Sequence, residues 1–87
     1  MTTTETDVLA GVTAIVREHF GVAPQRALPS ETHLRNQLSA DSIDEAEIAM
    51  QVEERFDVTI PDDAHPATIG EIAALVSKAL PLSAGKR

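Results

Sequence analysis

The sequence predicts an all-α fold: a small four-helix bundle with a long loop between the first and second helices and a short third helix. Three stretches repeat apolar residues with the 3.6-residue period of an amphipathic helix, and no stretch alternates apolar and polar residues as a half-buried strand does. The 87 residues are enough for one small core and too few for two. We therefore expect a single domain over residues 1–87.

The first helix is expected over about residues 5–20. Its apolar side chains share one side of the helical wheel, and they are Val8, Leu9, Val12, Ile15, Val16 and Phe20. Gly21 provides a C-terminal stop, and Pro24 then blocks any continuation of the helix. Residues 21–41 show no sustained period and are expected to form a long loop. A loop of this length is uncommon unless its own side chains pack into the core, and its leucines are the candidates.

The second helix is expected over about residues 42–56. Ser42 begins it and Glu45 follows three residues later, which is the Ser-x-x-Glu pattern of a capping box. Asp57 ends this helix, and Pro61 then keeps the residue before it extended. The helix is thus bounded on both sides by local signals.

A short third helix is expected over about residues 62–66, because Pro66 leaves room for little more than one turn. The fourth helix, over about residues 68–80, opens at Thr68 with a second capping-box pattern. The tail, residues 81–87, has nothing to bury, so we expect it to fray.

The composition excludes several classes of function. Fourteen acidic and seven basic residues give a formal net charge of −7, which repels nucleic acid and anionic membranes and attracts basic protein patches. The chain has no cysteine, so any sulfur chemistry must come from an attached group. The N-terminus lacks the pattern of a signal peptide, and no stretch approaches the ~20 apolar residues of a membrane span. We expect a cytoplasmic monomer that does not insert into membranes.

The second helix carries two apolar faces. At about 100° per residue, the set assigned to the core consists of Ile48, Ala49, Val52 and Phe56. A second set lies about 140° away and consists of Ile43, Ala46 and Met50. The second set is rimmed by Glu47, Glu53 and Glu54. An apolar centre with a charged rim is typical of a docking surface. On period alone, Ile43 could equally tuck under the preceding loop while Met50 fills a gap in the bundle.

Ser42 on its own is explained most simply as a helix cap. Nucleophilic catalysis has little support, because the chain has no Gly-x-Ser-x-Gly elbow and its three histidines, His19, His33 and His65, are scattered. The Asp-Asp-x-His stretch that ends at His65 lacks the spacing of a zinc or EF-hand site. The sequence therefore predicts no catalytic residue and no metal site.

Three motifs together resemble acyl carrier proteins. Residues 38–44, Leu-Ser-Ala-Asp-Ser-Ile-Asp, are similar to the loop whose Asp-Ser-Leu serine is modified in that family. Residues 53–57, Glu-Glu-Arg-Phe-Asp, resemble the acidic end of the family's second helix, and residues 60–62 match its Ile-Pro-Asp. The motifs occur in the family's order, and the resemblance covers residues 34–80 well and the first helix more loosely.

The resemblance implies that Ser42 accepts 4'-phosphopantetheine from coenzyme A through a phosphopantetheinyl transferase, with Asp41 helping recognition. The terminal thiol of this arm would carry acyl groups as thioesters in fatty-acid or specialised lipid or polyketide synthesis, and the chain itself would be no enzyme. Acyl-loading, synthase and acyltransferase enzymes would use basic docking patches to bind the second helix. The implied partner-binding positions are Ile43, Ala46, Glu47, Met50, Glu53 and Glu54.

Two alternatives stay open at this point. One is a peptidyl or aminoacyl carrier, because Asp-Ser-Ile also occurs in such domains. The other is an unmodified acidic interaction module in which Ser42 only caps the second helix. The sequence also departs from the family pattern at Ser39, where glycine is usual, and in a shortened segment between Ile60 and Ile69.

Overall fold

The computed structural model describes residues 3–61 and 63–80. This part of the chain folds into four α-helices and contains no β-strand beyond one isolated bridge. The helices are α1 (Thr3–Phe20), α2 (Leu34–Leu38), α3 (Ser42–Phe56) and α4 (Ile69–Ala79). The predicted all-α fold of four helices is confirmed. None of the helices in the described ranges combines the length and apolar character that crossing a membrane requires.

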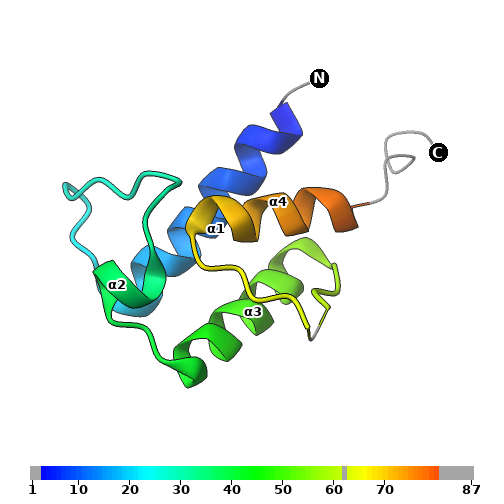
Figure 1. The fold of residues 1–87 in the computed structure, drawn as a ribbon. Coiled ribbons are helices and arrows are strands. Elements are labelled where there is room, and N and C mark those ends of the chain that lie inside the picture. Colours follow the sequence, from blue (N-terminus) through cyan, green and yellow to red (C-terminus); the bar gives the residue numbers. More distant parts are fainter. Residues whose placement is uncertain (1–2, 62, 81–87) are drawn as a thin grey trace.

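The core lies where α1 packs against α4 and α3 (Figure 1). It is aliphatic, with side chains from α1 (Val8, Val12, Ile15, Val16), α3 (Ile48, Val52), α4 (Ile69, Ile72, Ala73, Val76) and the connections (Leu28, Leu34, Ala40, Ile60). Both phenylalanines are only partly buried and pack against its edge. The period-based assignment of core faces is confirmed for α1 and α3.

Gly11 allows α1 and α3 to approach closely. It is buried on α1, and a Cβ atom built at this position would lie 2.6 Å from the Cζ atom of Phe56 on α3. Any larger residue would therefore push the Phe56 ring away from α1. The absence of a side chain at Gly11 thus lets α1 pack directly against the Phe56 ring of α3.

The long connection between α1 and α3 contains a helix that the sequence did not reveal. The predicted loop over residues 21–41 is interrupted by α2, which begins after His33 and ends at Ser39. The His33 imidazole accepts a hydrogen bond from the Asn36 N–H at 3.2 Å, and Leu34 anchors the helix in the core. A helix of five residues is too short to show a period, so only its caps and its buried leucine define it.

The short helix predicted over residues 62–66 is corrected by the structure: the short helix of this fold is α2. Asp62 lies outside the described residues, Asp63 forms a turn, and residues 64–67 are not helical. The backbone here is used for pairing, since the N–H of Leu34 donates to Ala67 O at 3.0 Å and the N–H of Ile69 donates to Thr32 O at 3.2 Å. This pairing holds the backbone before α4 extended at Thr68, and Pro66 disfavours helical backbone at the residue before it.

The other boundaries agree closely with the sequence. α1 begins two residues before its predicted start, α3 has its predicted bounds, and α4 is one residue shorter at each end. Thr68 caps α4 as predicted, with its hydroxyl accepting the Glu71 N–H at 3.1 Å. The predicted fraying tail, residues 81–87, lies outside the described residues.

Candidate functional site

Ser42 is exposed in the first turn of α3 and does not cap it. The N-cap is Asp41, whose Oδ1 accepts the Asp44 N–H at 2.9 Å, while Asp44 Oδ2 accepts the Asp41 N–H at 3.1 Å. The predicted capping box of Ser42 and Glu45 is therefore wrong. Asp41 stands at the same three-residue spacing from an acidic residue, and its ionised carboxylate is a stronger acceptor than a hydroxyl. The capping bonds of α3 leave the Ser42 hydroxyl unused.

Glu45, freed from capping, forms an ion pair that joins α2 to α3. The guanidinium of Arg35 donates from Nε to Oε2 of Glu45 at 2.7 Å and from Nη2 to Oε1 at 3.1 Å. This hydrogen-bonded guanidinium holds the pKa of the Glu45 carboxyl below its ordinary value, against the opposing effect of partial burial. Bidentate geometry gives the pair directional specificity, so it orients α2 against the start of α3.

A cavity of about 470 Å³ lies beside Ser42. It is enclosed by α2, α3, the 60–66 segment and one residue of α4, and Ser42 is one of its lining residues. Its buried lining is aliphatic and includes Leu34, Ile48, Ile60 and Ile72. Charged groups also line it, among them Arg35 and Glu45. The exposed Ser42 hydroxyl thus lies beside a cavity that is lined both by buried aliphatic side chains and by charged side chains.

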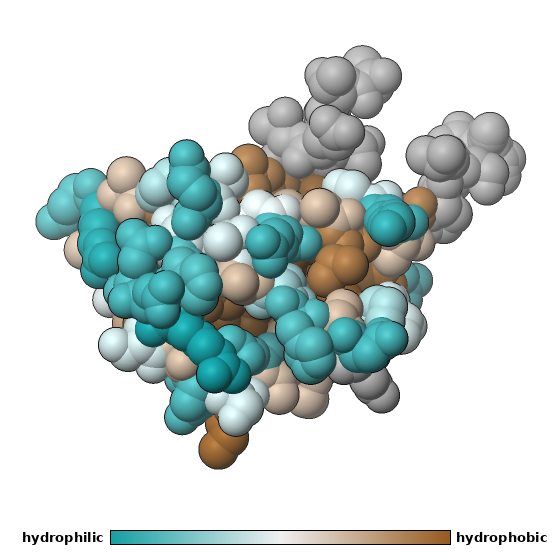
Figure 2. Space-filling model, in the orientation of Figure 1, coloured by the Kyte–Doolittle hydropathy of each residue, from teal (hydrophilic) through white to brown (hydrophobic). Residues whose placement is uncertain are grey.

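The second apolar face of α3 points to solvent. Ile43 and Met50 are 68% and 60% exposed, and they are the large hydrophobic side chains exposed in the described part of the chain. Ala46 between them is also exposed. The alternative in which Ile43 tucks under the loop and Met50 fills a gap is therefore wrong. Figure 2 shows a mostly hydrophilic face with a hydrophobic protrusion at its lower end, where Figure 1 draws the first turn of α3.

The three acidic rim residues have different surroundings. Glu54 is exposed. Glu53 is partly buried, and its Oε2 accepts the backbone N–H of Ile60 at 2.7 Å, which holds the segment after α3. Glu47 lies 3.7 Å from Nε2 of His19 on α1. Two of the three glutamates thus also make contacts within the fold.

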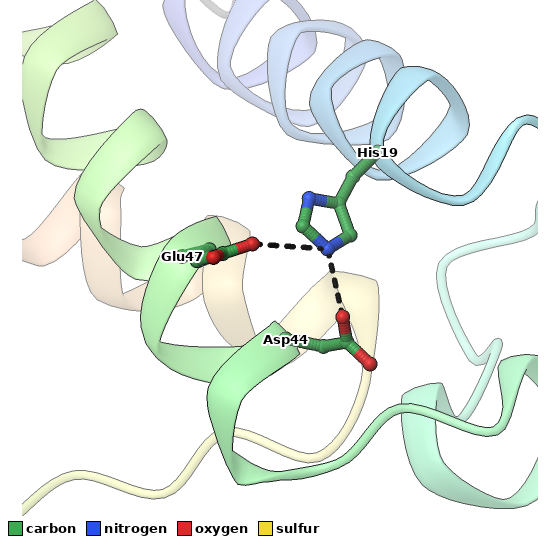
Figure 3. Close-up of side chains that lie close together, drawn as sticks. All are labelled: His19, Asp44 and Glu47. Atoms are coloured by element: carbon green, nitrogen blue, oxygen red, sulfur yellow. Dashed lines mark hydrogen bonds and ion pairs between the residues drawn. The ribbon is translucent and has the colours of Figure 1, made fainter.

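The contact of Glu47 belongs to a cluster that sequence patterns did not reveal (Figure 3). His19 Nε2 lies 3.0 Å from Asp44 Oδ1, and ligand atoms of His19, Asp44 and Glu47 all lie within 4.8 Å of one another. The hydrogen bond from His19 is the main cause that lowers the pKa of Asp44, with the backbone bond to Asp41 adding to it. His19 is 25 positions from Asp44 in the chain, so no local spacing signals this cluster.

Comparisons with known proteins find one family over most of the chain. The model of the family described as "Phosphopantetheine attachment site" matches residues 10–76. The acyl carrier protein of Phenylobacterium zucineum is 38% identical over 76 residues, covering 85% of this chain and 95% of that protein. That of Caulobacter vibrioides is 36% identical over 74 residues, covering 83% and 94%. The meromycolate extension acyl carrier protein of Mycolicibacterium smegmatis is 32% identical over 80 residues, covering 90% and 80%.

The matched region runs from α1 to α4 and includes the whole helix start at Ser42. Its length and the coverage of both chains exclude a match confined to one motif. The chain belongs to the acyl carrier protein family, whose members are carrier proteins rather than enzymes and bear a covalently attached 4'-phosphopantetheine.

Proposed function

We propose that this protein carries acyl groups as thioesters on a 4'-phosphopantetheine arm attached to Ser42. The observation that carries the proposal is the helix start, where Asp41 makes the capping bonds and the exposed Ser42 hydroxyl is left for modification. A serine needed as a cap would lose that role on esterification. Here the hydroxyl can be esterified without breaking the capping box.

The helix start also fits a phosphodiester. The N–H groups of the first turn of a helix lack partners within the helix and favour bound anions. In α3 the N–H groups of Asp44 and Glu45 are bonded to Asp41. The capping box does not use the N–H groups of Ser42 and Ile43, which are therefore the proposed donors to an esterified phosphate. Asp41, exposed beside the serine, is proposed to contact the transferase, with a divalent ion on the transferase side.

Attachment requires one phosphoryl transfer. The Ser42 oxygen forms a bond to the phosphorus next to the pantetheine of coenzyme A, the pyrophosphate bond breaks, and adenosine 3',5'-bisphosphate leaves while the serine proton is lost to solvent or to the transferase. When attached, the arm supplies the thiol that this chain lacks, and the thiol holds acyl groups as thioesters. The cavity beside Ser42, with its aliphatic lining, supports shelter of the acyl chain within the bundle.

The second face of α3 is the proposed docking surface. Ile43, Ala46 and Met50 form its apolar centre, and exposed hydrophobic side chains surrounded by charge favour protein association. Glu47, Glu53 and Glu54 supply the acidic rim, and the net charge of −7 steers the protein toward basic patches. The proposed partners are the phosphopantetheinyl transferase and the acyl-loading, synthase and acyltransferase enzymes.

The proposed setting is fatty-acid or specialised lipid or polyketide synthesis in the cytoplasm, served by a monomeric carrier domain over residues 1–87. Two of the relatives carry the plain name acyl carrier protein, and a third is named for meromycolate extension. All three names support a role in carrying acyl groups, and the third also supports a role in their extension.

Intact-mass spectrometry tests the proposal. Incubation with coenzyme A and a phosphopantetheinyl transferase should add the mass of one phosphopantetheine, and Ser42→Ala should abolish the addition. Ser39→Ala is the matched control, since Ser39 is an exposed serine three residues before Ser42. An unmodified wild type across several transferases, or full modification of Ser42→Ala, would contradict the assignment.

A further inference from the structure

The cluster of His19, Asp44 and Glu47 lies at the crossing of two helices (Figure 3). His19 comes from the last turn of α1, and both carboxylates come from the first half of α3. The two carboxylates approach the same ring nitrogen, with Nε2 lying 3.0 Å from Asp44 Oδ1 and 3.7 Å from Glu47 Oε1. A single proton on Nε2 cannot make two strong hydrogen bonds, so the arrangement offers more acceptors than the imidazole can satisfy.

We propose that His19, Asp44 and Glu47 bind Zn²⁺ or a similar first-row transition metal ion. Zinc binds imidazole nitrogen and carboxylate oxygen at about 2.0–2.2 Å, so neighbouring ligand atoms of a tetrahedral site lie about 3.4 Å apart. The two separations from Nε2, 3.0 and 3.7 Å, lie on either side of this value. Small rotations of the two carboxylates would complete the site, with water as the fourth ligand.

The donor set selects the class of metal. Calcium and magnesium prefer sites built only from oxygen, whereas an imidazole nitrogen favours zinc, copper, nickel and iron. The side chain of His19 is only 13% exposed, and those of Asp44 and Glu47 are 30% and 56% exposed. The nitrogen ligand is therefore held between the helices, and the oxygen ligands lie on the side from which an ion would enter.

Neighbouring groups orient two of the three ligands. Oδ2 of Asp44 is held by the backbone N–H of Asp41, which leaves Oδ1 directed at His19. The other ring nitrogen of His19, Nδ1, lies 3.3 Å from Nε2 of Gln51. A metal on Nε2 places a proton on Nδ1, and a half-turn of the Gln51 amide presents Oε1 to accept it. The Phe20 ring packs edge-on against the imidazole at 4.9 Å between centroids.

Three of the groups at this site come from consecutive turns of α3. Asp44, Glu47 and Gln51 are spaced at i, i+3 and i+7, so all three lie on the same side of α3 as His19. A bound ion would link the end of α1 to the start of α3. One of its ligands, Asp44, is two residues from Ser42, and another would be Glu47. Since the site requires neither modification of Ser42 nor docking, it is independent of the proposed function.

Metal titration of the untagged, unmodified protein tests the proposal. Zn²⁺ is titrated calorimetrically in excess Mg²⁺, which occupies the non-specific carboxylates, and Co²⁺ is titrated in parallel by visible absorption. We expect one equivalent of each ion to bind and the Co²⁺ complex to show intense tetrahedral bands. His19→Gln should weaken binding by at least ~10-fold, and Gln51→Ala by about 10-fold, the usual effect of losing an outer partner.

The controls separate a metal site from a structural contact. His19→Gln keeps an amide that can donate a hydrogen bond to Asp44, so this variant should stay folded. Circular dichroism checks that it does. His65→Gln removes a histidine elsewhere in the chain and should bind Zn²⁺ as the wild type does, as should Ser42→Ala. Absence of a stoichiometric site in Mg²⁺, or wild-type affinity in folded His19→Gln, would overturn the proposal.

Discussion

Asp41 and Asp44 cap α3 reciprocally, each carboxylate accepting the backbone N–H of the other residue, at 2.9 and 3.1 Å. The pair encloses Ser42 and Ile43 within one helical turn. The start of α3 is thereby capped without use of the Ser42 hydroxyl. This arrangement supports the proposed modification of Ser42, because esterification of its hydroxyl would leave the cap intact.

The first prediction follows from this pair. Asp41→Ala should lower the free energy of unfolding by about 1 kcal/mol, the usual effect of losing an N-cap. Ser42→Ala should change it by less than about 0.5 kcal/mol, because an exposed side chain without a capping role is removed. Urea denaturation of both variants provides the comparison. Asp41→Asn, which retains a capping acceptor, should lie close to the wild type; equal destabilisation by Asp41→Ala and Ser42→Ala would contradict the assignment of the cap.

Ser39 has a left-handed backbone conformation, with φ 59° and ψ 34°, at the C-cap of α2. Glycine adopts this conformation without the Cβ penalty that serine incurs. Ser39→Gly should therefore raise the free energy of unfolding by several tenths of a kcal/mol, up to about 1 kcal/mol, net of the greater freedom of glycine in the unfolded chain. The urea midpoint measures this gain. Asn36→Gly, inside α2, is the matched control and should destabilise by a similar amount.

The ion pair of Arg35 and Glu45 predicts a dependence of stability on pH. The hydrogen bond from Arg35 lowers the folded-state pKa of Glu45 below its ordinary value. The pair's contribution is therefore fully present above the unfolded pKa and is lost as pH falls through the lower, folded pKa. Thermal melts between about pH 6 and pH 3 should show a steeper loss of Tm in the wild type than in Glu45→Gln. Parallel curves of Tm against pH for the two proteins would show that the ion pair does not contribute to stability.

The two apolar faces of α3 predict opposite effects of truncation. Ile43→Ala and Met50→Ala remove side chains that are 68% and 60% exposed, so they should change stability little and weaken partner binding. Ile48→Ala removes a fully buried side chain and should destabilise the fold by about 2–5 kcal/mol. Thermal melts and surface plasmon resonance against an immobilised phosphopantetheinyl transferase measure the two effects. Unchanged binding in both exposed variants would show that this face does not dock.

The acidic rim predicts a dependence of binding on salt. Glu54→Lys reverses an exposed charge on the proposed docking surface and should slow association with a basic partner. The effect should be larger at low than at high ionic strength, because exposed charges are screened over about 10 Å at 0.1 M salt. Association rates at several salt concentrations provide the test. Asp7→Lys, an exposed charge reversal on α1, should have a much smaller effect.

Much of the fold follows from local sequence. The 3.6-residue period placed α1, α3 and α4 within two residues of their observed bounds, because an amphipathic helix records its buried side in every turn. The same period places Ile48 on a different face of α3 from Ile43 and Met50, and in the structure Ile48 is buried while Ile43 and Met50 are exposed. The motif around Ser42 predicted the family, since its residues are contiguous in the chain.

Tertiary structure decided the features that depend on residues far apart in sequence or on competition between similar local signals. Asp41 and Ser42 are both acceptable caps, and the choice rests on the geometry that the preceding loop gives to Asp41. The helix α2 is defined by burial of Leu34, and the extended backbone just before α4 by pairing of residues 67–69 with residues 32–34.

Ser42 and His19 show most clearly which features the sequence determines and which depend on the tertiary structure. Sequence alone determined a carrier of the phosphopantetheine-attachment type with an acidic, apolar-centred helix after Ser42, because those signals lie within a few turns of one helix. Only the fold brought His19 to Asp44, 25 residues away. A contact of that kind depends on how two helices pack across the core, and side-chain periodicity records which face of a helix is buried but not which residue meets it.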